Sequence, residues 1–134
     1  MTIKLMFGYM SSTPFWYGTY LPQRIQGIII RDYCLSNDIV LKWSIPEISK
    51  ENRTFTYHRL VKYAGENNID GIVIISYLMH SFSIIEEIIE EAHANGLSIH
   101  FAIENVSISK NEDPGSFWST AQAAHLAKGW ENVA

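Results

Sequence analysis

The middle of the chain reads Asp70-Gly71-Ile72-Val73-Ile74-Ile75-Ser76. Four β-branched residues in a row, with a turn signal before them and a serine after them, indicate a short strand that is buried on both faces. Such strands belong to parallel sheets, because the helices that connect parallel strands cover both faces of the sheet. This stretch therefore predicts an α/β domain.

Three further apolar runs lie on either side of this stretch. Together they predict strands at 3–10, 39–44, 70–76 and 97–103. The segments between them carry apolar residues at helical spacing and predict helices at 22–36, 54–67 and 84–95. Strands that alternate with helices are typical of a three-layer, doubly wound α/β domain. We expect a mainly parallel, four-stranded sheet in the order 2-1-3-4, with helices on both faces.

The last part of the chain differs from this pattern. We expect an α/β domain over 1–110 and a tail over 111–134, in which Phe117 and Trp118 begin a short helix over 117–128. The tail packs either on the domain or on a partner subunit. The four tryptophans and seven tyrosines exceed the needs of one small core, and two of the tryptophans lie in the tail. We therefore expect a homo-oligomer that buries part of the tail.

The charge of the chain argues against nucleic-acid binding. Lys and Arg number ten and are outnumbered by acidic residues, so the formal net charge is −4. The basic residues also form no run. A general binder of duplex DNA needs a basic face that neutralises phosphates. The sequence therefore predicts no nucleic-acid partner.

The sequence carries no signal for a cofactor, a metal or a membrane. It has one cysteine, Cys34, and its five histidines show no ligand spacing. It contains neither a glycine-rich dinucleotide motif nor a phosphate-binding loop motif. No apolar run reaches the length of about 18 residues that a membrane span needs. We expect no metal, no cofactor and no membrane contact, and we expect the protein in the cytoplasm.

The doubly wound fold predicts where a ligand binds. In an open parallel sheet, ligands bind beyond the carboxyl ends of the strands, and helix N-termini that point there favour anions. We expect catalytic acid–base groups at His100, Glu47 and Glu104. The substrate-binding candidates are Tyr9, Ser11, Ser12, Gln23, Ser44 and Ser76. Further polar residues in the same segments are Thr13, Tyr17, Arg53 and His80.

Each of these residues also has a structural interpretation. Serine and threonine after a strand commonly form turns, and Glu104 can cap a helix or pair with an arginine. His100 lies inside a predicted strand, where a hydrogen-bonded core histidine is the alternative to a catalytic one. On an extended strand His100 and Glu104 lie about 13 Å apart, so they share one site only where the chain bends.

An aromatic loop follows the first predicted strand. It carries Phe15, Trp16, Tyr17 and Tyr20. Exposed aromatic clusters mark ligand or partner surfaces, and sugar rings stack on them. The alternative is that the loop folds back and covers an edge of the sheet.

Several motifs stand in a distinctive order. They are Gly8-Tyr9 followed by a Ser/Thr cluster, Arg31-Asp32-Tyr33-Cys34, and Ile69-Asp70-Gly71-Ile72-Val73 leading to Ser76. This order resembles the catalytic domain of the serine recombinases, which has the resolvase-like fold. That family opens with Tyr-x-Arg-x-Ser and later has Ser-Arg-Leu-x-Arg. Here Ser11 stands in place of the first arginine, and Tyr77 and His80 stand in place of the other two. Because those arginines stabilise phosphate charge, we expect no strand-exchange chemistry.

A second set of positions covers about residues 8–108. It consists of Gly8-Tyr9, Ser12, Pro14-Phe15, Pro22-Gln23, Gln26, Arg31-Asp32-Tyr33-Cys34, Ser44, Glu47, Ser76, His100-Phe101-Ala102 and Glu104. In these positions the chain resembles the sporadic carbohydrate cluster proteins, small bacterial proteins encoded within surface-polysaccharide gene clusters. One position departs, because that family has an arginine where Thr13 stands. If the arginine binds an anionic substrate, this chain differs in ligand.

The second resemblance implies a role in sugar or sugar-nucleotide metabolism. We therefore expect a protein of surface-carbohydrate biosynthesis that binds an activated or acidic sugar, with acid–base chemistry as the first reaction to test. The sequence leaves open whether the chain is an enzyme and whether the reaction is that of an isomerase, a lyase or a hydrolase. One alternative is a non-catalytic partner subunit of a carbohydrate-biosynthetic enzyme. A third is a degenerate serine-recombinase-like protein.

Overall fold

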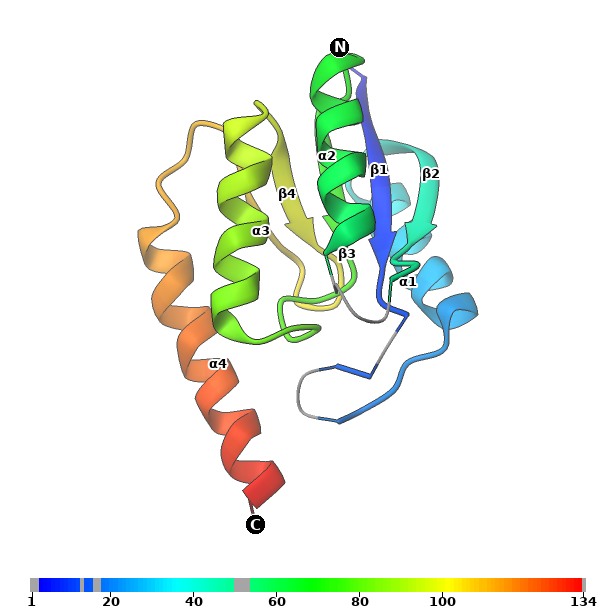
Figure 1. The fold of residues 1–134 in the computed structure, drawn as a ribbon. Helices are drawn as coiled ribbons and strands as arrows, with labels where there is room; N and C mark the ends of the chain where they lie inside the picture. Colours follow the sequence, from blue (N-terminus) through cyan, green and yellow to red (C-terminus); the bar gives the residue numbers. More distant parts are fainter. Residues whose placement is uncertain (1–2, 13, 16–17, 50–53, 134) are drawn as a thin grey trace.

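A computed structural model describes residues 3–12, 14–15, 18–49 and 54–133, with side chains described as far as Ala127. The elements in chain order are β1 (Lys4–Met10), α1 (Gln23–Ser36), β2 (Ile39–Pro46), α2 (Phe55–Glu66), β3 (Gly71–Ile74), α3 (Phe82–Ala94), β4 (Ser98–Phe101), β5 (Val106–Ile108) and α4 (Gly115–Val133). They form three layers: α2 and α3 lie side by side on one face of the sheet, and α1 lies on the other (Figure 1).

The sheet has the strand order β2-β1-β3-β4-β5. β1 pairs in parallel with β2 and β3, and β3 pairs in parallel with β4. The predicted order 2-1-3-4 of parallel strands is therefore confirmed. Because the four strands run in one direction, their carboxyl ends lie together at one end of the sheet. We call this end of the strands the carboxyl edge (Figure 1). The opposite edge, where they begin, is called the amino edge.

β5 is a strand that the sequence pattern does not predict. It pairs antiparallel with β4, and Ser107 lies opposite His100. The chain reverses through a turn over 102–105, where Asn105 has a φ of 54° that asparagine tolerates better than most residues. A strand of three residues is too short to show a clear alternation of apolar and polar side chains. The sheet therefore has five strands where four were expected, and the fifth returns the chain to the amino edge.

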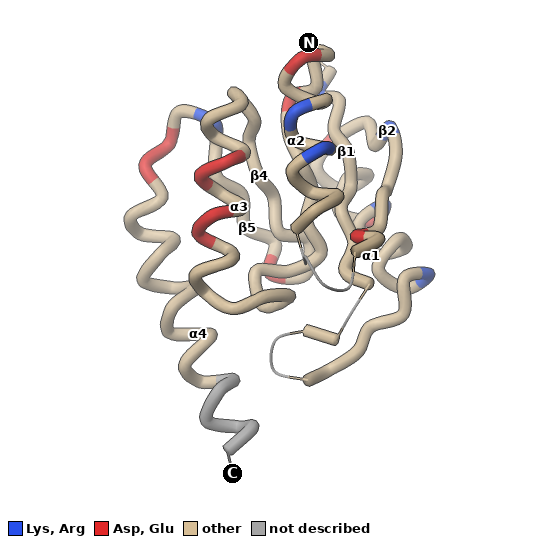
Figure 2. The backbone as a smooth tube through the Cα atoms, viewed as in Figure 1, with Lys and Arg blue, Asp and Glu red and all other residues tan. Residues whose placement is uncertain are grey.

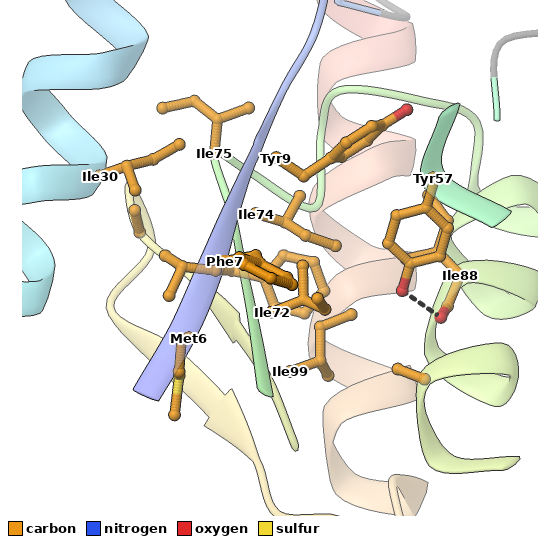
Figure 3. Packing of buried hydrophobic residues seen from close by; sticks show 14 of the residues in the cluster. Met6, Phe7, Tyr9, Ile30, Tyr57, Ile72, Ile74, Ile75, Ile88 and Ile99 are labelled. Carbon is orange, nitrogen blue, oxygen red and sulfur yellow. Dashed lines mark hydrogen bonds between the residues drawn. The ribbon is translucent and has the colours of Figure 1, made fainter. Parts of the chain in front are cut away.

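Side chains alternate between the two faces of the sheet along each strand. Phe7 and Tyr9 of β1 face α2, where the rings of Tyr9 and Tyr57 lie with their centroids 5.1 Å apart. The Tyr57 hydroxyl donates to the backbone carbonyl of Ile88 at 2.7 Å and so joins α2 to α3 (Figure 3). The buried residues that neighbouring strands add to this face include Ile72, Ile74, Ile99 and Phe101.

The opposite face carries α1, which packs chiefly on β1 and β2. Gly8 lies beneath this helix. A Cβ atom at Gly8 would lie 2.6 Å from Oγ of Ser44 and 3.0 Å from a methyl carbon of Ile30. The missing side chain therefore lets α1 approach the sheet closely.

β2 forms one edge of the sheet and is irregular. Its register with β1 shifts after the pair Met6 and Leu41, because Lys42 is an extra residue that forms a β-bulge. Beyond the bulge the pairing continues, and the strand ends at Pro46. The edge strand thus carries a bulge, a lysine in the bulge and a terminal proline.

α4 is longer than the helix predicted over 117–128, and it runs alongside α3 (Figure 1). Its first turns pack on the domain: Phe117 stacks on Phe101 of β4 with ring centroids 5.3 Å apart, and Trp118 meets Phe82 edge-on at 5.7 Å. These aromatic side chains of the tail therefore contribute to the core of their own chain. The expected homo-oligomer stays a prediction.

Candidate functional site

The loops at the carboxyl edge hold several of the predicted site residues. Ser11 directly follows β1, Glu47 directly follows β2, and Ser76 and Glu104 follow β3 and β4 within a few residues. Ser11, Glu47 and Ser76 are buried, and Glu104 is half-buried. The candidate positions that fall outside the described residues are Thr13, Trp16, Tyr17 and Arg53.

Glu47 anchors the start of α2. Its carboxylate accepts hydrogen bonds from the backbone N–H groups of Ser49 at 3.1 Å, Thr56 at 2.9 Å and Tyr57 at 3.2 Å, and from the hydroxyl of Tyr9 at 2.8 Å. A carboxylate at this position satisfies N–H groups of the first helical turn, which have no partner within the helix. Glu47 therefore links the end of β2 to the start of α2.

These hydrogen bonds alter the pKa values of both partners. Burial by itself raises the pKa of Glu47, but the backbone bonds from Thr56 and Ser49 and the bond from Tyr9 outweigh it and hold the pKa below its usual value. The pKa of Tyr9 is raised strongly, first by burial and then by its bond to Glu47. Near pH 7 Glu47 is thus ionised and Tyr9 is neutral, which makes Glu47 a weak proton acceptor.

Gln26 of α1 fixes the backbone of Ser11. Its side-chain oxygen accepts from the N–H of Ser11 at 2.8 Å, and its amide group donates to the carbonyls of Ser11 at 2.9 Å and Leu21 at 2.7 Å. Gln26 is fully buried, so these bonds satisfy its amide inside the protein. The sequence signal for this role is a glutamine on the inner side of a predicted helix. Ser12 and Gln23 are both half-buried.

Ser76 and Glu104 form a hydrogen-bonded pair beyond the ends of β3 and β4. The Ser76 hydroxyl donates to Oε2 of Glu104 at 2.6 Å, and the N–H of Tyr77 donates to Oε1 at 3.1 Å. Ser76 Oγ also accepts from the N–H of Leu78 at 2.9 Å. Burial raises the pKa of Glu104 above its usual value, although the hydrogen bonds and the charge of His125 act against it. The pKa of this carboxyl group is therefore shifted toward neutral pH.

Two buried histidines accompany this pair. The ring of His125 of α4 lies against Tyr77, with centroids 6.1 Å apart. Its Nδ1 lies 2.7 Å from the carbonyl oxygen of Ala121, and its Nε2 lies 3.0 Å from the carbonyl oxygen of His80. The sequence pattern does not single out His125, because its position depends on how α4 docks against the domain.

His100 lies within β4, on the face of the sheet that carries α1. Its Nδ1 is hydrogen bonded to the hydroxyl of Tyr33 at 2.7 Å, and its Nε2 lies 3.3 Å from Oγ of Ser98. Burial, and then the positive charge of Lys4, lower the pKa of His100 to about 4. His100 is therefore neutral near pH 7, and its hydrogen-bond partners are different from those of Glu104.

Ser44 also faces α1, from its position opposite Gly8 in the sheet. Its hydroxyl has no hydrogen-bond partner among the described residues. The predicted site residues therefore fall into separate groups rather than one cluster. The carboxyl edge holds the groups Tyr9–Glu47, Ser11–Gln26 and Ser76–Glu104, whereas His100 and Ser44 lie on the face of α1.

The described residues show no metal centre. In the parts of the chain that the structure describes, no three His, Cys, Asp or Glu side chains are grouped so that they could hold a metal ion. No described helix is long and apolar enough to span a bilayer. In the view of Figure 2 the Lys and Arg residues are spread over several elements, with Arg59 and Lys62 both in α2, and α3 carries a marked acidic stretch. Burial raises the pKa of the Cys34 thiol to about 11, so this cysteine is protonated near pH 7.

Comparison with known proteins supports the fold. The chain is similar to a solved structure described as a resolvase family site-specific recombinase from Streptococcus pneumoniae, with a TM-score of 0.63 and 9% sequence identity over 97% of this chain and 90% of that chain. No protein-family model and no curated protein sequence matches the chain. The expected resolvase-like, three-layer α/β fold is therefore confirmed.

Proposed function

We propose that this chain binds an activated or acidic sugar at the carboxyl edge and that Glu104 is the acid–base group of that site. The observation that carries the proposal is the hydrogen-bonded pair of Ser76 and Glu104, 2.6 Å apart beyond the ends of two adjacent parallel strands. In open parallel sheets this edge is where ligands bind. The pair places a hydroxyl group and a carboxyl group at that edge.

Glu104 is favoured over the other two predicted acid–base residues. The carboxylate of Glu47 already accepts bonds from four groups, and its lowered pKa makes it a weak base. His100 lies on the other side of the sheet with a pKa of about 4. Burial raises the pKa of Glu104, and a carboxyl group with a raised pKa is a better proton acceptor than one with a lowered pKa.

The chemistry of the pair suits a sugar. A partly buried carboxylate can accept a proton from a sugar hydroxyl or from a carbon next to a carbonyl group and can return it in a later step. Ser76 holds the carboxylate in position and has a hydroxyl that can also bond to the substrate. The reaction class depends on the substrate, because isomerisation, elimination and hydrolysis all need a positioned proton acceptor.

The carbohydrate role rests on the resemblance to the sporadic carbohydrate cluster proteins. The residues that carry the resemblance are hydrogen bonded to one another in this chain. The pairs are Tyr9 with Glu47, Tyr33 with His100, and Ser76 with Glu104. Such mutual contacts support the view that the shared positions act together, either as parts of a site or as supports for it.

A recombinase-like role is disfavoured at the same edge. The positions that hold arginine in the serine recombinases are Ser11, Tyr77 and His80 here, and all three are buried. None of these side chains can stabilise a phosphodiester as an arginine does. A non-catalytic partner subunit stays the alternative, because Tyr20 in the loop before α1 is 55% exposed and could contact another protein.

The test is a binding titration followed by NMR at backbone amides. The probes are UDP-glucose, glucose 1-phosphate and glucuronate, which separate the nucleotide, the phosphate and the carboxylate as the recognised group. We expect at least one probe to shift the amides of residues 76–78 and 104. Glu104→Gln and Ser76→Ala should each weaken that binding about ten- to a hundred-fold, while Glu87→Gln, a change at an exposed glutamate of α3, should leave it unchanged.

Two outcomes would overturn the proposal. One is that none of the three probes shifts the amides at the carboxyl edge. The other is that Ser76→Ala weakens binding and also substantially lowers the melting temperature of the protein. That result would make the pair a structural contact between the loops after β3 and β4.

A further inference from the structure

A polar cavity of about 260 Å³ lies at the amino edge, away from the carboxyl-edge residues. Its polar lining residues include Lys4, Ser98, His100, Ser107, Ser109 and Lys110. None of these except His100 belongs to the predicted site. The cavity volume is slightly below the lower end of the range of about 300–1,000 Å³ for small-molecule sites, so it suits a ligand no larger than a sugar phosphate.

The sheet register explains why these side chains meet. His100 of β4 lies opposite Ser107 of β5, and residues directly opposite each other project from the same face. Ser98 is two positions before His100 along β4 and therefore shares that face, and Ser109 directly follows β5 and also lines the cavity. α1 packs chiefly on β1 and β2, so this helix leaves the β4–β5 part of the face open. The antiparallel β5 thus adds hydroxyl groups to the open part of this face.

The hydrogen-bonding groups of the cavity are oriented by their surroundings. Nδ1 of the buried His100 is bonded to the hydroxyl of Tyr33, so the other ring nitrogen, Nε2, lies on the side of Ser98. Ser107 and Ser109 are exposed, and their hydroxyls can turn toward a ligand. The cavity therefore offers several hydroxyl groups and one imidazole from adjacent strands.

The charges around the cavity are positive in balance. Lys4 and Lys110 both line it, and Asp70 is the acidic residue that also lines it. Oδ2 of Asp70 accepts a hydrogen bond from the backbone N–H of Leu5 at 2.8 Å, so part of that carboxylate is already satisfied. The positive charge of Lys4 also acts on His100. A positive cavity in a chain of net charge −4 indicates a site for an anion.

We propose that this cavity binds a small phosphorylated molecule. The phosphate group would lie between the ammonium groups of Lys4 and Lys110, and the hydroxyls of the ligand would meet Ser98, Ser107 and the imidazole of His100. Lysine binds phosphate as a point charge, and serine hydroxyls complete the coordination. The site is separate from the carboxyl-edge site, because the two share no residue.

The experiment uses inorganic phosphate and glucose 1-phosphate as probes in an NMR titration. We expect both to shift the amides of residues 98–100 and 107–110. Lys4→Ala combined with Lys110→Ala should weaken binding by about ten- to a hundred-fold or more, because the loss of one hydrogen bond to a charged group already has an effect of about this size. The matched control combines Lys42→Ala with Lys62→Ala, which removes the same charge from exposed positions on β2 and α2. This control should bind as the unmodified protein does.

Further variants keep the result interpretable. Ser107→Ala changes an exposed side chain and should weaken the glucose 1-phosphate complex without changing the fold. Glu104→Gln should leave binding at the amino edge unchanged, so failure of the carboxyl-edge proposal is distinguishable from failure of this one. Absence of amide shifts at 98–100 and 107–110, or equal weakening by both lysine pairs, would overturn the proposal. The second of these results would mean attraction by general charge rather than a built site.

Discussion

The hydroxyl of Tyr33 lies 2.7 Å from Nδ1 of His100 and joins α1 to β4 across 67 positions of sequence. The two rings also meet edge-on, with centroids 5.7 Å apart. The bond satisfies one nitrogen of an imidazole that is only 8% exposed. It therefore fixes both the place of the helix and the orientation of the histidine.

Tyr33→Phe should lower the free energy of unfolding by about 1–3 kcal/mol, because the ring stays while a buried imidazole nitrogen loses its partner. Urea denaturation at pH 7 measures this loss. In the double variant with His100→Gln, the loss should be smaller than the sum of the two single losses, since the pair is then removed as a unit. Additive losses would show that the bond contributes little.

His100 should make the protein less stable in mild acid. Its pKa is about 4 in the folded protein against an ordinary value of 6.5. As the pH falls through 6.5, the unfolded chain therefore gains a proton that the folded state accepts only near pH 4. The resulting loss in the free energy of unfolding is absent above pH 6.5 and grows to about 3 kcal/mol at pH 4 and below.

The measurement is the free energy of unfolding between pH 7.5 and about 4, for the unmodified protein and for His100→Gln. Because both proteins share the same carboxyl groups, the difference between the two curves isolates the histidine. We expect the variant to lose less stability over this interval. Parallel curves would contradict the lowered pKa.

Glu47→Gln and Glu104→Gln should have different effects on stability at pH 7. The lowered pKa of Glu47 means that its charge stabilises the fold above its ordinary pKa of 4.5 and that this contribution is lost as the pH falls through the folded-state value. In Glu47→Gln the glutamine also directs an amide group toward N–H donors. We therefore expect this variant to lower the free energy of unfolding by about 1–3 kcal/mol.

The raised pKa of Glu104 has the reverse meaning. The charged carboxylate is disfavoured in the folded state, and stability rises as the pH falls through the folded-state value. Neutral Glu104→Gln should therefore melt at or above the temperature of the unmodified protein. Thermal unfolding of the two variants in one buffer tests the contrast, and equal losses would contradict it.

Gly8→Ala should destabilise the contact between α1 and the sheet by about 1–3 kcal/mol, the usual cost of an overpacked core. The added Cβ would lie 2.6 Å from Oγ of Ser44. Because that hydroxyl has no described partner, Ser44→Ala alone should cost little, and the double variant should recover part of the loss. A double variant as unstable as Gly8→Ala would locate the strain at Ile30 instead.

The chain should not bind duplex DNA beyond a weak non-specific level and should not nick it. Its net charge is −4, and the arginine positions of the serine recombinases hold Ser11, Tyr77 and His80. A gel-shift assay at low salt is the appropriate test, because electrostatic binding is strongest there. Sequence-specific retention of a duplex would contradict this prediction.

The parallel part of the fold could be predicted because its signals are local. The run Ile72 to Ile75 is apolar without interruption, as a strand covered on both faces requires. Helices between such runs then limit the topology to few choices. β5 could not be predicted, because three residues carry no period and the strand forms only by pairing with β4.

The site was predicted less completely, for a geometric reason. Position in the chain shows that Ser76 and Glu104 follow strands, and the fold brings such positions to one edge. Position does not show which face a side chain takes, and His100 turns toward Tyr33 rather than toward Glu104. The cavity at the amino edge depends on β5, so the sequence pattern could not indicate it.

The irregular β2 affects how copies of this protein can associate. A regular, exposed edge strand is a template on which a second chain can add a strand, and bulges, lysines and prolines oppose this. β2 has a bulge at Lys42 and ends at Pro46, and the strand at the other edge has only three residues. Continuous sheets between molecules are therefore disfavoured at both edges. If the expected homo-oligomer forms, its interface should consist of helix surfaces, and the protein should resist strand-to-strand aggregation when concentrated.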